Sequence, residues 1–217
     1  MAEELSGGIR ESDGSSQPRE SHFLAILSRM KYIERWALMR SSRPENLSEH
    51  SLEVALIAHM LCVIANVRHG CALDAERAAL VALYHDASEI ITGDLPTPVK
   101  YHDGQIHDAY KAVEASAEER LLETLPADLR PAFEDVFWPT ADADADELYL
   151  RRLVKAADKI SALIKCVDEA RSGNAEFASA EKTCRASVEE ASYELPEVAD
   201  FVREFLPSYG ATLDELL

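Results

Sequence analysis

The sequence predicts an all-α fold, and three observations support that prediction. Hydrophobic residues make up 47% of the 217 residues but aromatic residues only 7%, and the apolar share comes largely from Ala and Leu, which favour helices. Apolar side chains recur every three or four positions over most of the chain, as on one face of a helix. No run of alternating β-branched residues indicates a strand. The length fits one domain with a sizeable core.

The first 20 residues are expected to form a disordered extension. They are rich in Ser, Gly and Glu and lack hydrophobic periodicity, so their burial could not offset the entropy lost on ordering. Their polar, acidic start also lacks the apolar region of a signal peptide. The folded domain is therefore expected to span 21–217.

The first helix is expected over 22–33, where apolar residues recur at helical spacing. A connector follows over 34–44, and it concentrates three arginines and a tryptophan. The next helix is expected to open at Asn46, because Asn46 and Glu49 have the spacing of a capping box. This helix is expected to run to about Val67.

The second part of the chain is punctuated by caps and prolines. Asp74 is expected to cap a helix that runs to about Ile90. Two prolines one residue apart in 92–100 must end that helix, since a proline lacks the N–H that a helix interior needs. Periodicity predicts the remaining helices at 106–124, 144–171, 175–192 and 196–206.

The charge balance restricts the partners of the protein. The chain carries 40 acidic against 22 basic residues, a net charge of −18, which argues against nucleic acids and anionic membranes as partners. No apolar run approaches the ~18 residues that cross a bilayer. The four cysteines show no CxxC spacing, which indicates reduced thiols and a cytoplasmic protein.

His50 is the first candidate for chemistry. It lies in the first turn of its helix and opens a stripe of apolar residues at +4, +7, +11 and +14, namely Val54, Ile57, Leu61 and Ile64. These positions share one helical face, so the imidazole is expected to point toward the core. Taken alone, such a residue is more often a hydrogen-bonded core histidine than a metal ligand.

The dipeptide His85-Asp86 is a stronger signal. Asp86 shares a helical face with apolar residues, namely Ala79, Ala82 and Leu83, and is expected to face inward. A buried carboxylate is costly unless it is paired or binds a metal. An ordinary helix-end carboxylate is the alternative, and it fits a position within an apolar face poorly.

Asp158 lies in the middle of a predicted helix, where aspartate is disfavoured. Its alternative interpretation is an ion pair with Lys or Arg on a solvated face. Together with the preceding candidates it gives two imidazoles and two carboxylates on three helices. Such a nitrogen and oxygen set suits Mn, Fe, Co, Ni or Zn better than Ca.

These residues follow the H…HD…D signature of the HD-domain metal-dependent phosphohydrolases, and the chain more specifically resembles the bacterial 5′-deoxynucleotidase family. The resemblance covers about Ser21 to the C-terminus. It is carried by the stretches SHFLAILSRMKYIERWALMR, RPENLSEHSLEVALIAH, ALYHDASEIITGDLPTPVKY and LVKAADKISALIKC. The bare signature is only moderately specific, but the RW pair, ENLSEHS and HDASE…TGDLPTPVK in this order are highly specific.

The resemblance implies a single HD-domain helical bundle with a metal site between its helices. It implies hydrolysis of 2′-deoxyribonucleoside 5′-monophosphates to deoxynucleoside and phosphate by a metal-activated water, and a homodimer. One divalent ion, Co, Mn or a similar transition metal, would be bound by four ligands: His50, His85, Asp86 and Asp158. The predicted helices 175–192 and 196–206 either supply the dimer interface or pack on the domain.

The resemblance also implies the substrate contacts. Arg35 would orient the phosphate, for which a planar guanidinium is suited, and Trp36 would crowd the sugar 2′ position. Tryptophans are more commonly packing residues, which is the alternative for Trp36. The residues implied to line the nucleotide site are Asp94, Leu95, Pro96 and Thr97, with Asp86 and Asp158 near the phosphate.

Glu89 and Asp94 are the candidates for handling the proton. Glu89 follows His85 by four residues and so overhangs the same helical face. Either carboxylate could position the water or transfer the proton, and the alternative is that both support the ligating histidines. His59 lies about 180° around the helix from His50, so one metal is expected rather than two.

Three functional classes remain open from the sequence. The leading hypothesis is the 5′-deoxynucleotidase activity. A second is another HD phosphohydrolase, either a dNTP triphosphohydrolase or a cyclic-nucleotide phosphodiesterase, although a triphosphate needs more cations than the motifs supply. A third is a nucleotide-sensing module without turnover, against which the intact ligand set argues.

Overall fold

The computed structural model describes residues 20–96 and 103–217. In this part of the chain helices dominate, and the strands are the two-residue β1 (Glu34–Arg35) and β2 (Glu45–Asn46), paired antiparallel. The all-α prediction is confirmed. The short strand pair was not predicted, because two residues carry no readable alternation. The predicted extension over 1–20 falls, except for Glu20, outside the described residues.

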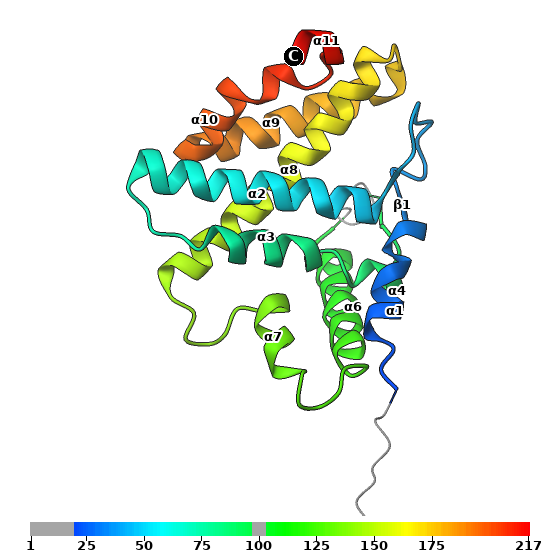
Figure 1. Cartoon of the computed structure of the whole chain (residues 1–217). Helices are drawn as coiled ribbons and strands as arrows, with labels where there is room; N and C mark the ends of the chain where they lie inside the picture. The colour runs from blue at the N-terminus through cyan, green and yellow to red at the C-terminus, as the bar shows by residue number, and fades with distance from the viewer. Residues whose placement is uncertain (1–19, 97–102) are drawn as a thin grey trace, which may run out of the picture.

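Helix α2 (Leu47–His69) crosses the middle of the fold (Figure 1). It packs against α3 (Ala75–Tyr84), α8 (Ala145–Arg171) and α10 (Pro196–Glu204). The predicted capping box is confirmed, since the Asn46 side chain accepts hydrogen bonds from the backbone of Ser48 and Glu49. The helix ends at Gly70, whose φ of 71° is readily adopted only without a Cβ.

The apolar character of α2 exceeds what the sequence analysis allowed for. By length and composition alone this helix could cross a membrane, yet 56% of its most apolar window is buried inside the fold. Its few charged residues are spread among apolar ones. A search for uninterrupted apolar runs therefore did not detect its high mean hydropathy. Burial at the centre of a helical bundle accounts for the composition.

The predicted helix ending near Ile90 is interrupted. Helix α3 ends at Tyr84, a turn follows over 85–88, and the short α4 (Glu89–Thr92) begins after it. The Ala82 carbonyl accepts from both the backbone and the imidazole Nδ1 of His85. This side-chain bond competes with the regular helix ladder and places His85 and Asp86 in a turn.

The helices predicted at 106–124, 144–171, 175–192 and 196–206 agree with the structure within a few residues, whereas the short helices over 131–137 and 213–216 were not predicted. Residues predicted as one helix over 22–33 form α1 (Phe23–Leu27) and a 3₁₀ helix, η1 (Ser28–Tyr32). The remaining elements are α6 (Gly104–Leu122), α7 (Pro131–Phe137), η2 (Ala175–Phe177), α9 (Ala178–Glu194), η3 (Leu206–Ser208) and α11 (Leu213–Leu216).

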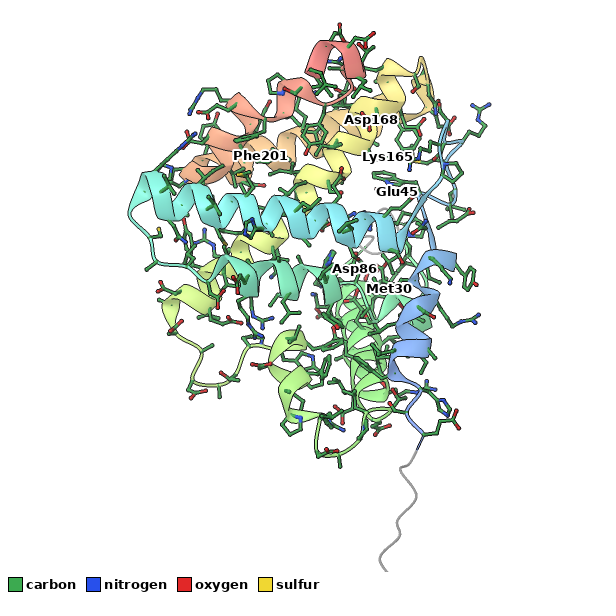
Figure 2. All side chains as sticks on the ribbon, viewed as in Figure 1. Met30, Glu45, Asp86, Lys165, Asp168 and Phe201 are labelled. Atoms are coloured by element: carbon green, nitrogen blue, oxygen red, sulfur yellow. The ribbon has the colours of Figure 1, made fainter. Side chains whose placement is uncertain are left out.

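Two apolar clusters hold these elements. The larger one lies among α2, α3, α8, α9 and α10 and includes Val188 and Phe201 (Figure 2). The smaller one joins α1 to α6 through Phe23, Leu121 and Leu122. The apolar stripes of α9 and α10 thus pack on the domain, which is one of the two alternatives left open for 175–192 and 196–206.

Candidate active site

Four side chains converge on one point from three parts of the fold. His50 comes from the first turn of α2, His85 and Asp86 from the turn after α3, and Asp158 from the middle of α8. One donor atom from each of His50, His85 and Asp158 lies within 4.8 Å of the others. Asp86 Oδ2 lies 3.1 Å from His85 Nε2 and 3.5 Å from His50 Nε2. The structure therefore brings all four predicted ligands together.

Both imidazoles are anchored through Nδ1. His85 Nδ1 lies 2.7 Å from the Ala82 carbonyl, and His50 Nδ1 lies 3.1 Å from Ser161 Oγ. The two Nε2 atoms are buried and make no hydrogen bond of regular geometry among the described residues, although carboxylate oxygens of Asp86 and Asp158 lie 3.1 to 3.5 Å from them. Buried polar atoms are rarely left so, and two such nitrogens beside two carboxylates fit a divalent transition metal.

The electrostatics of the cluster attract positive charge. Burial alone would raise the pKa of Asp86, but His85 and His50 beside it hold that pKa well below its usual range. Burial alone would lower the pKa of His85, but Asp86 and then Asp158 outweigh it and raise that pKa to about 9. The carboxylates are thus ionised and draw a cation to this point.

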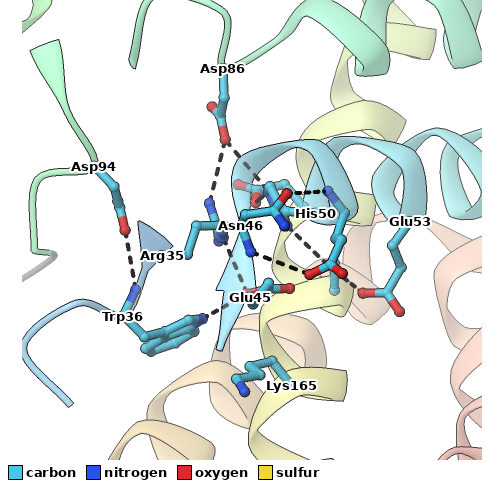
Figure 3. Close-up of polar contacts among 12 residues, drawn as sticks. Arg35, Trp36, Glu45, Asn46, His50, Glu53, Asp86, Asp94 and Lys165 are labelled. Carbon is cyan, nitrogen blue, oxygen red and sulfur yellow. Dashed lines mark hydrogen bonds and ion pairs between the residues drawn. The ribbon is translucent and has the colours of Figure 1, made fainter. Parts of the chain in front are cut away.

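Arg35 lies at the edge of this cluster. The pairing of β1 with β2 sets Arg35 opposite Glu45, and Arg35 Nε lies 3.4 Å from Glu45 Oε2. On its other side the guanidinium lies 3.5 Å from Asp86 Oδ2 (Figure 3). Burial would lower its pKa, but Asp158, Asp86 and Glu45 outweigh it and raise the pKa. Arg35 therefore supplies a permanent positive charge beside the predicted metal ligands.

Trp36 adopts an unusual backbone conformation. Its φ of 59° is the only positive φ of a non-glycine residue in the described ranges, and such a residue costs about 1–3 kcal/mol. Its backbone N–H donates to Asp94 Oδ2 at 3.3 Å, and its indole N–H donates to Glu45 Oε2 at 3.1 Å. The ring packs on Phe177, with centroids 5.4 Å apart. Three groups from separate segments, Asp94, Glu45 and Phe177, thus hold Trp36 in place.

The remaining predicted residues follow α4. Asp94 lies just beyond its end and reaches Trp36 as described (Figure 3). Glu89 begins α4 and is buried, and Leu95 and Pro96 are half-buried. Thr97 lies outside the described residues. His59, which was excluded as a ligand, is exposed on α2.

Sequence reasoning missed the polar residues behind the site. Ser161 and Glu53 form a hydrogen-bonded chain to His50. Glu169 accepts hydrogen bonds from Lys165 Nζ at 2.5 Å and from the backbone N–H groups of Ser42 and Arg43 at 2.7 and 3.3 Å. In the sequence, Lys165 and Glu169 have the spacing of an ordinary surface pair, so only the fold reveals that they are buried.

Comparison with known proteins decides the family. The family described as 5′-deoxynucleotidase YfbR-like matches residues 22–209. This chain belongs to the YfbR-like 5′-deoxynucleotidase family. A 5′-deoxynucleotidase of Vibrio cholerae is 50% identical over 198 residues, which cover 91% of this chain and 99% of the relative. The 5′-deoxynucleotidase YfbR of Escherichia coli is 46% identical over 198 residues, with 91% and 96% covered.

Solved structures identify the fold of this family member. An HD-domain phosphohydrolase of Listeria innocua aligns with a TM-score of 0.74 at 24% identity, over 88% of this chain and 90% of its own. The HD phosphohydrolase DatZ of cyanophage S-2L, solved with dA and one catalytic Zn²⁺, aligns with a TM-score of 0.60 at 21% identity, over 87% and 96%. The predicted HD-domain helical fold is thereby confirmed.

Proposed function

We propose that this protein is a metal-dependent 5′-deoxynucleotidase that hydrolyses 2′-deoxyribonucleoside 5′-monophosphates to deoxynucleoside and phosphate. The observation that carries the proposal is the meeting of two histidines and two aspartates beside Arg35 and Trp36. The names of the relatives from Vibrio cholerae and Escherichia coli support the same activity. The catalytic unit is residues 21–217, and the family match beginning at residue 22 supports that boundary.

The metal is held by the four converging side chains, His50, His85, Asp86 and Asp158. Two carboxylates balance the charge of one divalent cation, and one such group of ligands occurs among the described residues, so one Co, Mn or similar ion is expected. When bound, such an ion polarises a phosphoryl oxygen and lowers the pKa of water. The orphaned Nε2 atoms of both histidines support this assignment.

Arg35 and Trp36 select the substrate. A phosphate dianion would compete with Asp86 and Glu45 for the Arg35 guanidinium, whose Nε has no hydrogen-bond partner within the described part of the chain. The fixed indole of Trp36 would leave no space for a ribose 2′-hydroxyl. The residues that would line the rest of the nucleotide site are Asp94, Leu95, Pro96 and Thr97.

The proton transfer that accompanies hydrolysis is assigned to Glu89 or Asp94. Glu89 is buried three residues after Asp86, which supports a role at the reacting phosphate. Asp94 accepts from the Trp36 backbone, which also supports a role in positioning the indole. Normal metal content and near-normal turnover in Asp94→Asn would contradict the proton-transfer role of Asp94 and leave that role to Glu89.

We place the homodimer expected from the resemblance on a surface other than the core-facing sides of α9 and α10. The outward face of α2 is a candidate, because Leu52, Leu56 and Val67 are 55%, 66% and 78% exposed. Apolar patches of this kind commonly mark interfaces. We assign the dimer contact to this face and the protein to the cytoplasm.

Phosphate release from matched substrates tests the proposed function. The protein is stripped with a chelator, reloaded with Co²⁺ or Mn²⁺, and incubated with dAMP, AMP, dATP and a cyclic nucleotide. Release of inorganic phosphate from dAMP, with little from AMP, is the expected result. Release of triphosphate from dATP or opening of the cyclic nucleotide would favour another HD phosphohydrolase, and no turnover of any substrate would favour the sensor.

A further inference from the structure

A hydrogen-bonded chain runs from the back of His50 to a carboxylate. Ser161 Oγ lies 3.1 Å from His50 Nδ1 and 2.6 Å from Glu53 Oε2. His50 and Ser161 are fully buried, and neither sequence motif nor family resemblance assigns a role to Ser161 or Glu53. Glu53 lines a cavity of about 510 Å³ between the start of α2 and the end of α8. Burial raises the pKa of Glu53, and the hydrogen bond that Ser161 Oγ donates to it opposes that rise.

The direction of these bonds follows from the number of protons. An ionised carboxylate only accepts, and a hydroxyl donates one proton. The Ser161 hydroxyl therefore donates its hydrogen bond to Glu53, and the Ser161 oxygen accepts a hydrogen bond from His50 Nδ1–H. A neutral imidazole carries one N–H, so Nε2 of His50 is left with a lone pair facing the carboxylates.

We propose that Glu53 is a positioning residue for the metal, because through Ser161 it holds His50 in the Nδ1–H tautomer. The inference rests on the proposed role of His50 as a ligand. Without Glu53, the Ser161 hydroxyl can turn and donate to Nδ1. That favours the Nε2–H tautomer, in which the nitrogen facing the metal site has no lone pair to offer.

His85 provides an internal comparison. Its Nδ1–H is held by the Ala82 backbone carbonyl, an acceptor that cannot reverse its role. The tautomer of His85 is thus fixed by the main chain, whereas that of His50 depends on one side chain reached through another. Loss of Glu53 is accordingly expected to alter His50 and leave His85 unchanged.

The test measures metal affinity and tautomer separately. Co²⁺ binding is measured by competition with a chromophoric chelator for the native protein, Glu53→Ala, Glu53→Gln and Ser161→Ala. Ser51→Ala is the matched control. Ser51 is a buried serine next to His50 in the sequence, and its hydroxyl takes no part in the hydrogen bonds that link His50, Ser161 and Glu53. Nitrogen chemical shifts of the imidazoles in the metal-free proteins, read above pH 9 so that His85 is also neutral, report which ring nitrogen is protonated.

Glu53→Ala is expected to weaken Co²⁺ binding about 10- to 100-fold, as loss of a group that supports a ligand commonly does, and to shift His50 toward Nε2–H. Glu53→Gln should lose less, since its amide oxygen still accepts from Ser161, and Ser51→Ala should bind as the native protein does. If Glu53→Ala binds Co²⁺ within twofold of native with His50 unchanged, the proposal is overturned. If His50→Ala also binds as native, the metal assignment itself fails. If Glu53→Ala does not fold, the Co²⁺ affinity of Glu53→Gln and the imidazole nitrogen shifts of Ser161→Ala test the proposal instead.

Discussion

The candidate metal centre and the connector over 34–44 are built in different ways. The four predicted ligands are presented by α2, α8 and the turn that ends α3, so their positions follow from regular helices packed over a common core. The connector, which carries Arg35 and Trp36, has two strand residues and otherwise no regular structure of its own. Its shape depends on polar contacts from distant residues.

Glu169 supplies many of those contacts. It accepts from the backbone of Ser42 and Arg43, while Lys165 donates to the Arg43 carbonyl and lies 5.5 Å from the Phe177 ring on which Trp36 packs. Helix packing therefore positions the four candidate ligands, whereas a buried ion pair helps to position the connector. The comparison implies that chemistry and substrate choice can be damaged independently.

The largest effect is expected at the metal centre. Asp158→Asn should lose stable metal binding and reduce phosphate release from dAMP by well over about 100-fold, since loss of a supporting group alone costs about 10- to 100-fold. Metal content is measured by mass spectrometry after chelation and reloading. His59→Asn, on the exposed side of α2, is the control and should retain both properties.

Substrate choice should change next, with chemistry preserved. Trp36→Ala should raise the kcat/KM ratio of AMP to dAMP at least about tenfold, because a steric contact in a pocket discriminates by about 1–3 kcal/mol. Trp138→Ala removes the other tryptophan, which contacts Glu118 far from the connector, and should leave the ratio unchanged. An unaltered ratio in Trp36→Ala would mean that the indole only packs.

Breaking the buried ion pair should loosen the connector. Glu169→Gln leaves Lys165, 9% exposed, without its counter-charge, which costs about 3–5 kcal/mol of unfolding free energy. Urea unfolding measures the loss, and Co²⁺ affinity should stay native. Glu181→Gln breaks a partly exposed pair of the same spacing with Arg185 and should cost under about 1 kcal/mol. Equal losses in the two variants would contradict the distinction.

The same pair gives a pH dependence of defined sign. Burial would raise the pKa of Glu169, but hydrogen bonds from Lys165, Asn174 and Ser42 outweigh it and hold the pKa well below its usual range. A depressed folded-state pKa stabilises the protein above the unfolded-state value of about 4.3. The stability gap between native and Glu169→Gln should be constant from pH 8 to about 5.5 and shrink as the pH falls below about 4. A gap that widens on acidification would contradict the assignment.

The smallest effect on catalysis is expected at the outward face of α2. Leu56→Glu should convert the dimer into a monomer, measured by light scattering, with kcat for dAMP within about twofold because the face carries no predicted site residue. Leu148→Glu, at an exposed position on α8, should stay dimeric. A dimeric Leu56→Glu protein would exclude this face as the contact.

The sequence predicted the convergence of the four candidate ligands better than the shape of the connector, for a physical reason. His50 and Asp158 lie on helices in which apolar residues recur at helical spacing close to them in the sequence. The inward face of each helix could therefore be assigned without knowing the fold. The predicted end of α3 was too late in the chain. The hydrogen bond from His85 Nδ1 to the Ala82 carbonyl, which ends the helix, does not change the spacing of the apolar residues and so could not be predicted from it.

The residues that position the connector could not be predicted. Glu169 and Ser42 are separated by 127 residues, and Ser161 and Glu53 by 108. Polar pairs at such separations depend on how whole helices pack, and neither residue type nor spacing distinguishes them from solvated charges. Arg35 and Trp36 were identified through family resemblance, whereas their partner Glu45 appears only once the strands pair.

Asn46 links the two regions mechanically. It is at once the last residue of β2, paired with Glu34 in β1, and the cap of α2, whose first turn carries His50. The strand pair that carries Arg35 and the helix that carries a predicted metal ligand are therefore joined by a short backbone path. If a bound nucleotide tightens cation binding through this path, thermodynamic reciprocity requires the cation to tighten nucleotide binding by the same factor.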